Sequence, residues 1–360
     1  MDREYYYVAC PGVLGVRTNV KDFRWSYGAT MPLAARPQFD ECAVRIRVEV
    51  TDDVQLPPSD RLGKYHYWLG REGEDALFYD RPFCFGARLQ IAAKGLLGDE
   101  PCVKVNRTYY RYVSHRFMNL HSIGYILTDV ASMLLLRKGF APLHCSAFKY
   151  GDATVVVAAA PNTGKTLTSM TACMDHGAAY IAEDLAITDG RDVFAAPWTS
   201  TFRYYKQIDR SFRALLRNKA TQLLPPIELW SASRPKPITE YISADRVTAQ
   251  SRVTHVVLLE RGDEHVRAVD VDEAYRKMRN LNRYEFNYHK APLIIAYEYF
   301  NPQWNIDSAY RTEEESIRRL LRESNHVWVV RSENPTRYAD MLIEAIGRHA
   351  RGSTLDCEAA

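Results

Sequence analysis

The feature that most constrains this chain is an apolar run that leads directly into a Gly-Lys-Thr triplet. Residues 154–158 read Thr-Val-Val-Val-Ala, which is typical of a strand buried on both faces. The segment Ala159–Thr166 follows at once and matches the pattern G-x-x-x-x-G-K-[ST], except that Ala159 replaces the first Gly. Helical spacing then continues from about Lys165 to Asp175, and Gly177 ends it. Strand, loop and helix in this order predict a phosphate-binding P-loop unit.

The residues of this loop have the groups that bound phosphates require. Phosphate oxygens need backbone N–H groups at a helix N-terminus and a Lys side chain, and the accompanying Mg²⁺ needs a hydroxyl. Gly164, Lys165 and Thr166 supply these groups. The alternative is a glycine-rich turn whose Lys points to solvent. The positions expected to contact a nucleotide are Asn162, Thr163, Gly164, Lys165, Thr166 and Leu167.

Two adjacent acids follow the next predicted strand. Residues 179–182 form that strand, and Glu183 and Asp184 come directly after it. In P-loop proteins an acid at this place holds Mg²⁺ directly or through water. We expect Asp184 to bind the metal and Glu183 to accept the proton of an attacking hydroxyl. The alternative is that the two acids cap a helix or shape a turn.

These segments together resemble a known kinase family. Leu143-His144-Cys145-Ser146, a hairpin, the P-loop fifteen residues after the His, and the acidic pair about two dozen residues further on are similar to the catalytic domain of HPr kinase/phosphorylase. That domain is itself related to ATP-dependent phosphoenolpyruvate carboxykinase. The resemblance covers roughly residues 140–190. It implies an ATP- and Mg²⁺-dependent kinase that transfers the γ-phosphate to a hydroxyl.

The resemblance also implies roles for individual residues. Lys165 would lie on the phosphates, Thr166 and Asp184 on Mg²⁺, and Glu183 in the place of the catalytic Asp of the family. His144 would lie beside the nucleotide phosphates, and the alternative for it is a hydrogen-bonded histidine inside a strand. The family tends to form oligomers, so a homo-oligomer is a further expectation.

Three departures from the family pattern bear on the phosphate acceptor. Ala159 replaces the first loop Gly, Glu183 replaces an Asp, and Leu167 stands where the bifunctional enzymes that act on HPr commonly have an acid. The sequence is more similar to divergent relatives that act in biosynthesis or peptide modification. We therefore expect the acceptor to be a serine of a peptide or protein, or a small biosynthetic metabolite, rather than HPr.

Phosphoryl transfer also needs positive charge near the γ-phosphate besides Lys165. The candidates for this role and for substrate binding are Arg203 and, within a basic cluster that also includes Arg276, Lys277 and Arg279, above all Arg283. Arg283 ends a predicted helix, where the chain could form an active-site loop. The alternative for each of them is a charged side chain on a solvated helix face.

The rest of the chain suggests an α/β protein, α+β overall, with two parts. Residues 1–120 alternate short apolar runs with turns, and residues 43–50 place Val44, Ile46, Val48 and Val50 on one face of a strand. We expect a β-rich N-terminal module that docks a substrate or partner. A buried helix over 121–136 then opens a catalytic domain of residues 121–350, and residues 351–360 form a flexible tail.

The charge balance and the cysteines bear on the partners and the cellular location of the protein. The formal net charge is +3, from 47 basic and 44 acidic residues, which gives no reason to expect a nucleic-acid partner. No signal peptide or membrane-spanning run is evident, so we expect a cytoplasmic protein with no membrane partner. Seven Cys without a C-x-x-C pair fit scattered thiols.

Other functions remain open at this point. A regulatory or scaffold protein could bind ATP without turning it over, although Lys165, Thr166 and both acids are retained. A carboxykinase would need further metal ligands and substrate-binding Arg residues that the sequence does not identify. A GTPase is disfavoured because no Asn-Lys-x-Asp motif is present.

Overall fold

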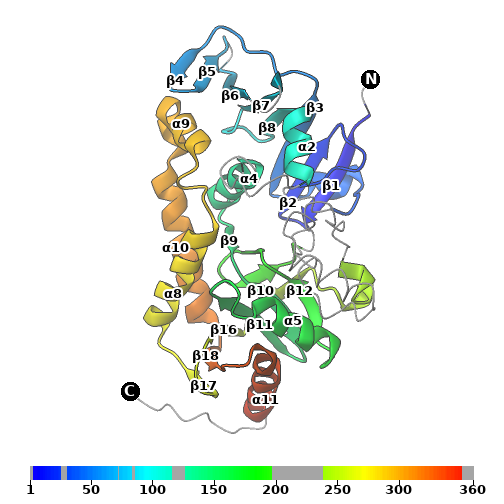
Figure 1. The fold of residues 1–360 in the computed structure, drawn as a ribbon, viewed down its shortest axis with the longest axis vertical. Helices are drawn as coiled ribbons and strands as arrows, with labels where there is room; N and C mark the ends of the chain where they lie inside the picture. The colour runs from blue at the N-terminus through cyan, green and yellow to red at the C-terminus, as the bar shows by residue number, and fades with distance from the viewer. Residues whose placement is uncertain are drawn as a thin grey trace.

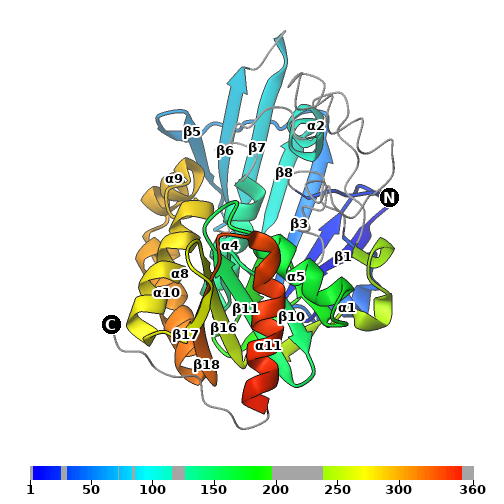
Figure 2. The same cartoon turned by 60° about the horizontal axis from the view of Figure 1, so that its bottom comes forward.

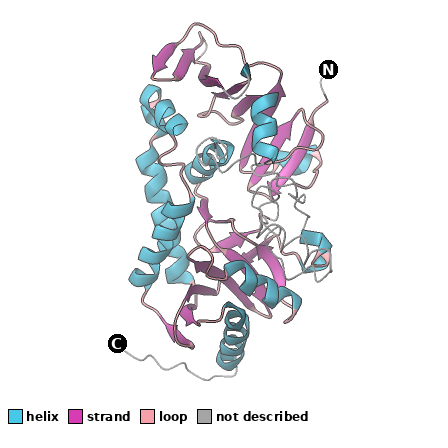
Figure 3. Ribbon diagram, in the orientation of Figure 1, coloured by secondary structure: helices cyan, strands magenta, loops and turns pink. Residues whose placement is uncertain are grey.

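Three β-sheets and eight α-helices make up the described part of the chain (Figures 1 and 3). The computed structural model describes residues 3–25, 31–71, 73–82, 86–115, 126–196 and 238–350. The expected mixed α/β class is confirmed. Within these ranges no helix has the length and apolar character that crossing a membrane requires.

The N-terminal segment forms a mixed sheet of eight strands. Its strand order is β1-β2-β3-β8-β7-β6-β5-β4, and β3 lies parallel to both of its neighbours. Strand β3 confirms the predicted alternation at Val44, Ile46 and Val48, which are buried, whereas Val50 is only half-buried. The elements are β1 (Tyr5–Cys10), β2 (Leu14–Thr18), α1 (Arg36–Asp40), β3 (Val44–Thr51), β4 (Asp60–Leu62), β5 (Tyr65–Leu69), β6 (Asp75–Pro82), β7 (Arg88–Lys94), β8 (Cys102–Asn106) and α2 (Arg107–His115).

A second sheet contains the predicted strand before Gly-Lys-Thr. Its order is β12-β10-β11-β16-β18-β17, and β11, β16 and β18 run parallel at its centre. Both faces are covered by helices, with α5 and α11 on one side and α8 and α10 on the other (Figure 2). The elements are β10 (Ser146–Tyr150), β11 (Ala153–Ala159), α5 (Lys165–Met174), β12 (Ala179–Ala182), β16 (His255–Glu260), β17 (His265–Ala268), α8 (Val271–Glu285), α10 (Ile306–Glu323), β18 (His326–Arg331) and α11 (Tyr338–Ala350).

Strand β11 is continuously apolar because its two faces are buried in two different hydrophobic clusters. Val155 and Val157 belong to the cluster under α5 and α11, whereas Val156 and Ala158 belong to the cluster under α8 and α10. A parallel strand covered on both faces has no solvated side, so every position favours an apolar residue. The sequence-based prediction of a doubly buried strand is therefore confirmed.

A third, antiparallel sheet has the order β15-β14-β13-β9. The sequence predicts one strand over residues 143–150, ahead of a turn at Gly151 and Asp152, and this prediction is wrong. The segment is divided between β9 and β10, which belong to different sheets. The break lies at His144 and Cys145, where the chain crosses between the sheets. The elements are β9 (Ala141–Leu143), β13 (Ala186–Thr188), β14 (Asp192–Phe194) and β15 (Gln250–Arg252).

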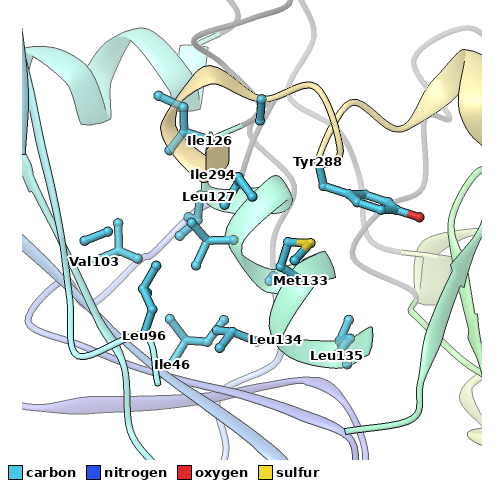
Figure 4. Close-up of a cluster of buried hydrophobic side chains, with 14 of the residues drawn as sticks. Ile46, Leu96, Val103, Ile126, Leu127, Met133, Leu134, Leu135, Tyr288 and Ile294 are labelled. Carbon is cyan, nitrogen blue, oxygen red and sulfur yellow. The ribbon is translucent and has the colours of Figure 1, made fainter. Parts of the chain in front are cut away.

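Helix α4 (Ile126–Arg137) links the N-terminal sheet to the C-terminal helices. Its apolar side chains lie between strand residues such as Ile46 and Val103 and residues such as Ile294 of α9 (Pro292–Phe300), as Figure 4 shows. One buried cluster thus joins residues from Tyr7 to Ala309. The predicted helix began at residue 121, but 116–125 lie outside the described residues. The expected boundary near residue 120 stays a prediction.

Candidate functional site

The predicted P-loop, residues 159–166, connects β11 to α5 at the carboxyl end of the parallel strands. The backbone of Gly164 has a φ of 126°, and a Cβ built there would meet the Cβ of Pro335 at 3.1 Å. Glycine adopts this conformation far more readily than other residues, and any side chain here would also crowd Pro335. The glycine that the motif predicted therefore has a physical reason in this fold. In α/β sheets ligands commonly bind at this edge.

Two tight turns lie side by side where the chain crosses between the second and third sheets. The N–H of Cys145 donates to the carbonyl of Leu143 (3.1 Å), and the N–H of Leu185 donates to the carbonyl of Glu183 (2.9 Å). The strands before and after these turns pair with one another in both sheets. This double crossing brings His144, at the centre of the first turn, next to Asp184, at the centre of the second.

The backbone of Asp184 adopts a left-handed conformation with a φ of 69°. This region is uncommon for a residue with a side chain, and a three-residue turn of this kind is strained. Such backbone strain is concentrated at functional sites. The backbone conformation of Asp184 therefore supports its assignment to a functional site, in addition to the chemistry of its carboxylate.

Lys165 is buried and contacts two of the expected residues. Its Nζ lies 2.9 Å from Nε2 of His144 and 3.8 Å from Oδ1 of Asp184. An ammonium group can only donate, so Nε2 of His144 accepts and the ring hydrogen is assigned to Nδ1. Burial, and then the charge of Lys165, lower the pKa of His144 to about 4, although Asp184 opposes this shift. A neutral His144 follows from both observations.

Thr166 and Glu183 form a second pair on the other side of the acidic turn. The Thr166 hydroxyl donates to Oε1 of Glu183 at 2.5 Å, and the Glu183 side chain is fully buried. A hydroxyl and a carboxylate are hard oxygen donors of the kind that Mg²⁺ prefers, so this pair fits the metal that the resemblance implies. Within the described ranges no three His, Cys, Asp or Glu side chains gather closely enough to hold a metal by themselves. A Mg²⁺ bound to this pair would take its other ligands from phosphates and water.

Helix α8 contributes two site residues that the sequence reasoning did not assign. Asn282 accepts from the backbone N–H of His144 (3.0 Å) and donates to the carbonyl of Pro142 (2.9 Å) and to Glu313 (3.0 Å). Glu285 places Oε2 at 3.9 Å from Nδ1 of His144. One signal pointed to Glu285: it ends the helix, where the macrodipole favours cations over acids.

One of the two expected cations is paired with an acid of another helix, and the other falls outside the described part of the chain. Arg283 contacts Glu314 of α10 at 3.3 Å, and its guanidinium lies 5.7 Å from the centre of the Tyr310 ring. Arg203 falls in residues 197–237, outside the described residues. Arg261, which follows β16, donates to the carbonyl of Asn162 in the predicted P-loop at 3.5 Å. Sequence reasoning missed Arg261 because its proximity depends on the pairing of β16 with β11.

The site thus brings together most of the residues that the sequence analysis predicted. They come from segments of the chain between β9 and α8. Direct contacts within 4 Å connect Lys165, His144 and Asp184, and a hydrogen bond connects Thr166 to Glu183. Of the remaining predicted P-loop positions, Asn162 is exposed, Thr163 is buried and Leu167 is half-buried. No protein-family model matches the chain, and no curated protein sequence matches it.

Proposed function

We propose that this protein is an ATP- and Mg²⁺-dependent kinase of the HPr kinase type, which transfers the γ-phosphate of ATP to a hydroxyl group. The observation that supports this most is the convergence of the Lys165–His144–Asp184 and Thr166–Glu183 contacts beside a loop that requires glycine. A cation, a hydroxyl and two carboxylates are the groups that phosphoryl transfer uses, since its catalysis is mainly positioning and charge stabilisation.

Lys165 is the group proposed to bind the β- and γ-phosphates. Lys165 is the first residue of α5, and the free backbone N–H groups at a helix N-terminus also attract anions. A neutral His144 accepts one hydrogen of this ammonium and leaves the others for phosphate oxygens. If His144 were protonated, it would repel Lys165 and withdraw this support.

The geometry favours an exchange of the roles that the sequence reasoning gave to the two acids. Glu183 is fully buried and hydrogen-bonded to Thr166, so it is placed to hold the metal together with that hydroxyl. The Asp184 side chain is 35% exposed, so an acceptor hydroxyl can reach it from solvent. We therefore assign the metal to Thr166 and Glu183, and proton acceptance to Asp184.

The chemical step then balances as follows. The acceptor hydroxyl oxygen bonds to the γ-phosphorus, the bond from that phosphorus to the β–γ bridging oxygen breaks, and the hydroxyl proton passes to Asp184. Lys165 balances the charge that remains on ADP. Mg²⁺, when bound, would neutralise charge on the phosphate oxygens. The proposed acceptor is a serine of a peptide or protein, or a small metabolite, docked with help from the N-terminal sheet.

The experiment measures ATP binding by calorimetry and phosphate transfer to candidate hydroxyl compounds by mass spectrometry. Lys165→Ala should abolish transfer, whereas Lys138→Ala, which removes an exposed lysine at the end of α4, should leave it intact. Asp184→Asn should bind ATP with Mg²⁺ and fail to transfer. Glu183→Gln should lose the Mg²⁺ dependence of ATP binding.

Two outcomes would contradict the proposal in different ways. ATP bound but never transferred by the unmodified protein, with Asp184→Asn behaving identically, would indicate a regulatory or scaffold protein. The opposite pattern of the two acid variants would restore the sequence-based assignment, in which Glu183 accepts the proton and Asp184 binds the metal.

A further inference from the structure

Glu285 occupies a position that is unfavourable for an acid. It is the last residue of α8, so it lies at the end of the helix where the macrodipole disfavours negative charge. Its side chain is only 28% exposed, and it makes no hydrogen bond to another described residue. Burial, and then the charge of Asp184, raise the pKa of its carboxyl group, while Lys165 opposes the shift. The stability of the helix therefore gives no reason for an acid at this position.

His144 supplies the complementary observation. Its Nδ1 is buried and has no side-chain hydrogen-bond partner within the described residues, while Nε2 is engaged by Lys165. The backbone of Asp184 also interacts with the ring and acts to raise the pKa of His144. Two carboxylates flank Nδ1, with Asp184 at 3.8 Å and Glu285 at 3.9 Å. Because Nδ1 carries the ring hydrogen in this arrangement, these two carboxylates are the nearest side-chain groups that could accept it.

Asp184 is not free to be that acceptor throughout the reaction. Its Oδ1 also lies 3.8 Å from Lys165, and the proposed function assigns its carboxylate to the acceptor hydroxyl. Glu285 has no such second task. A catalytic nitrogen that must stay oriented commonly has a dedicated carboxylate on the other side of the ring.

We propose that Glu285 is a positioning residue, which accepts the Nδ1 hydrogen of His144 and thereby keeps Nε2 directed at Lys165. The consequence for the site is a chain of contacts from Glu285 through His144 to Lys165, with Asp184 left free for the acceptor. The role given to Glu285 in phosphate transfer rests on the proposed function. The contact between Glu285 and His144, however, can be tested on the protein without any ligand.

The test follows the Nδ1 hydrogen of His144 by NMR in the full chain labelled with ¹⁵N-histidine, with the resonance assigned by its loss in His144→Asn. Glu285→Gln keeps an acceptor oxygen and should keep the resonance. Glu285→Leu removes the acceptor, and exchange of this hydrogen with water should become at least about tenfold faster, the lower range for one lost hydrogen bond to a charged group. Asp272→Asn, which removes an exposed acid from the other end of α8, should match the unmodified protein.

Activity and stability supply the second readout. Phosphate transfer by Glu285→Leu should fall about 10- to 100-fold at saturating ATP, with a smaller loss in Glu285→Gln. The unfolding midpoint of Glu285→Leu should not fall, because the variant removes a partly buried acid from a helix C-terminus. A merely structural role for Glu285 would instead lower the midpoint and leave hydrogen exchange at His144 unchanged.

The outcomes separate this inference from the proposed function. An unchanged His144 resonance in Glu285→Leu overturns the role of Glu285, whatever the protein does with ATP. If the unmodified protein neither binds nor transfers phosphate from ATP, the proposed kinase function fails, while the resonance in Glu285→Leu still decides whether Glu285 holds His144.

Discussion

At the scale of single residues, backbone strain coincides with the candidate chemistry. Among the described residues, the non-glycine positions with positive φ are Asn162, Asp184 and Asn305. Asn162 lies in the predicted P-loop and Asp184 in the acidic turn, whereas Asn305 caps α10. Asn and Asp tolerate this conformation better than other side chains. Two of the strained positions therefore contribute directly to the arrangement of the site.

Gly164 allows a prediction that separates crowding from backbone strain. Gly164→Ala would force a side chain into a φ of 126° and press its Cβ against Pro335, 3.1 Å away. We expect a loss of about 1–3 kcal/mol in the free energy of unfolding and loss of ATP binding. Urea unfolding and calorimetric titration with ATP measure the two effects.

Gly151→Ala is the matched control for this variant. Gly151 lies in the turn between β10 and β11 with a φ of 57°, and a Cβ there would meet nothing within 4 Å. We expect it to lose stability through strain alone and to keep ATP binding. Retained ATP binding in Gly164→Ala would contradict the assigned role of this loop.

At the scale of secondary-structure elements, three histidines meet where β16 and β18 begin and α11 ends. The rings of His255 and His326 are 4.7 Å apart between centres, as are those of His326 and His349. Burial, and then the neighbouring histidines, lower the pKa of His255 to about 3. The folded protein therefore holds His255 neutral at pH values where an unfolded chain, with a pKa near 6.5, would bind a proton.

The sign of the pH dependence follows from this difference. Between about pH 6.5 and pH 3 the unfolded state binds more protons, so stability falls as the pH falls through this window. At pH 4.5 the contribution of His255 amounts to roughly 2–3 kcal/mol lost relative to pH 7.5. His255→Asn, which keeps a hydrogen-bonding group for Thr254, should flatten the slope of unfolding free energy against pH. An unchanged slope in urea titrations from pH 4.5 to 7.5 would contradict this account.

The elements show what local pattern can and cannot predict. Strand β11, the following loop, helix α5 and strand β12 agree with the predicted ranges, because each follows from hydrophobic period and from glycine within a short window. The break between β9 and β10 was missed, since an apolar run does not reveal that its two halves pair in different sheets.

The part of the candidate site that lies within one short stretch of sequence could be predicted. Lys165, Thr166, Glu183 and Asp184 lie within one strand–helix–strand unit, and His144 came from the resemblance. Asn282 and Glu285 reach His144 from a helix far along the chain, through tertiary packing that single-sequence patterns do not encode. The roles assigned to all these residues stay predictions.

At the scale of the whole molecule, the N-terminal sheet and the C-terminal helices share one buried cluster. Ile294 of α9 is fully buried in it, while its neighbour Ile295 is 47% exposed. Ile294→Ala should cost about 2–5 kcal/mol, through lost burial and the cavity left behind. Ile295→Ala should change stability by about 0.5 kcal/mol or less.

The number of unfolding transitions tests whether the buried cluster couples the N-terminal sheet to the C-terminal helices. Because α10 extends from this cluster to α8, which contributes site residues, we expect Ile294→Ala to move a single unfolding transition. Tryptophan fluorescence and far-UV circular dichroism should both record it. Two separate transitions, of which the substitution moves only one, would show that the parts unfold independently.

The shared cluster also sets an order of events during synthesis. The strands of the first sheet leave the ribosome early, but the cluster that covers them includes residues as far along as Ala309. At about 5–20 residues per second, the apolar face of that sheet waits on the order of tens of seconds for α9 to be made. Until α4 and then α9 have been made, apolar strand residues of the nascent chain stay uncovered, so chaperones that hold such chains should bind its N-terminal third.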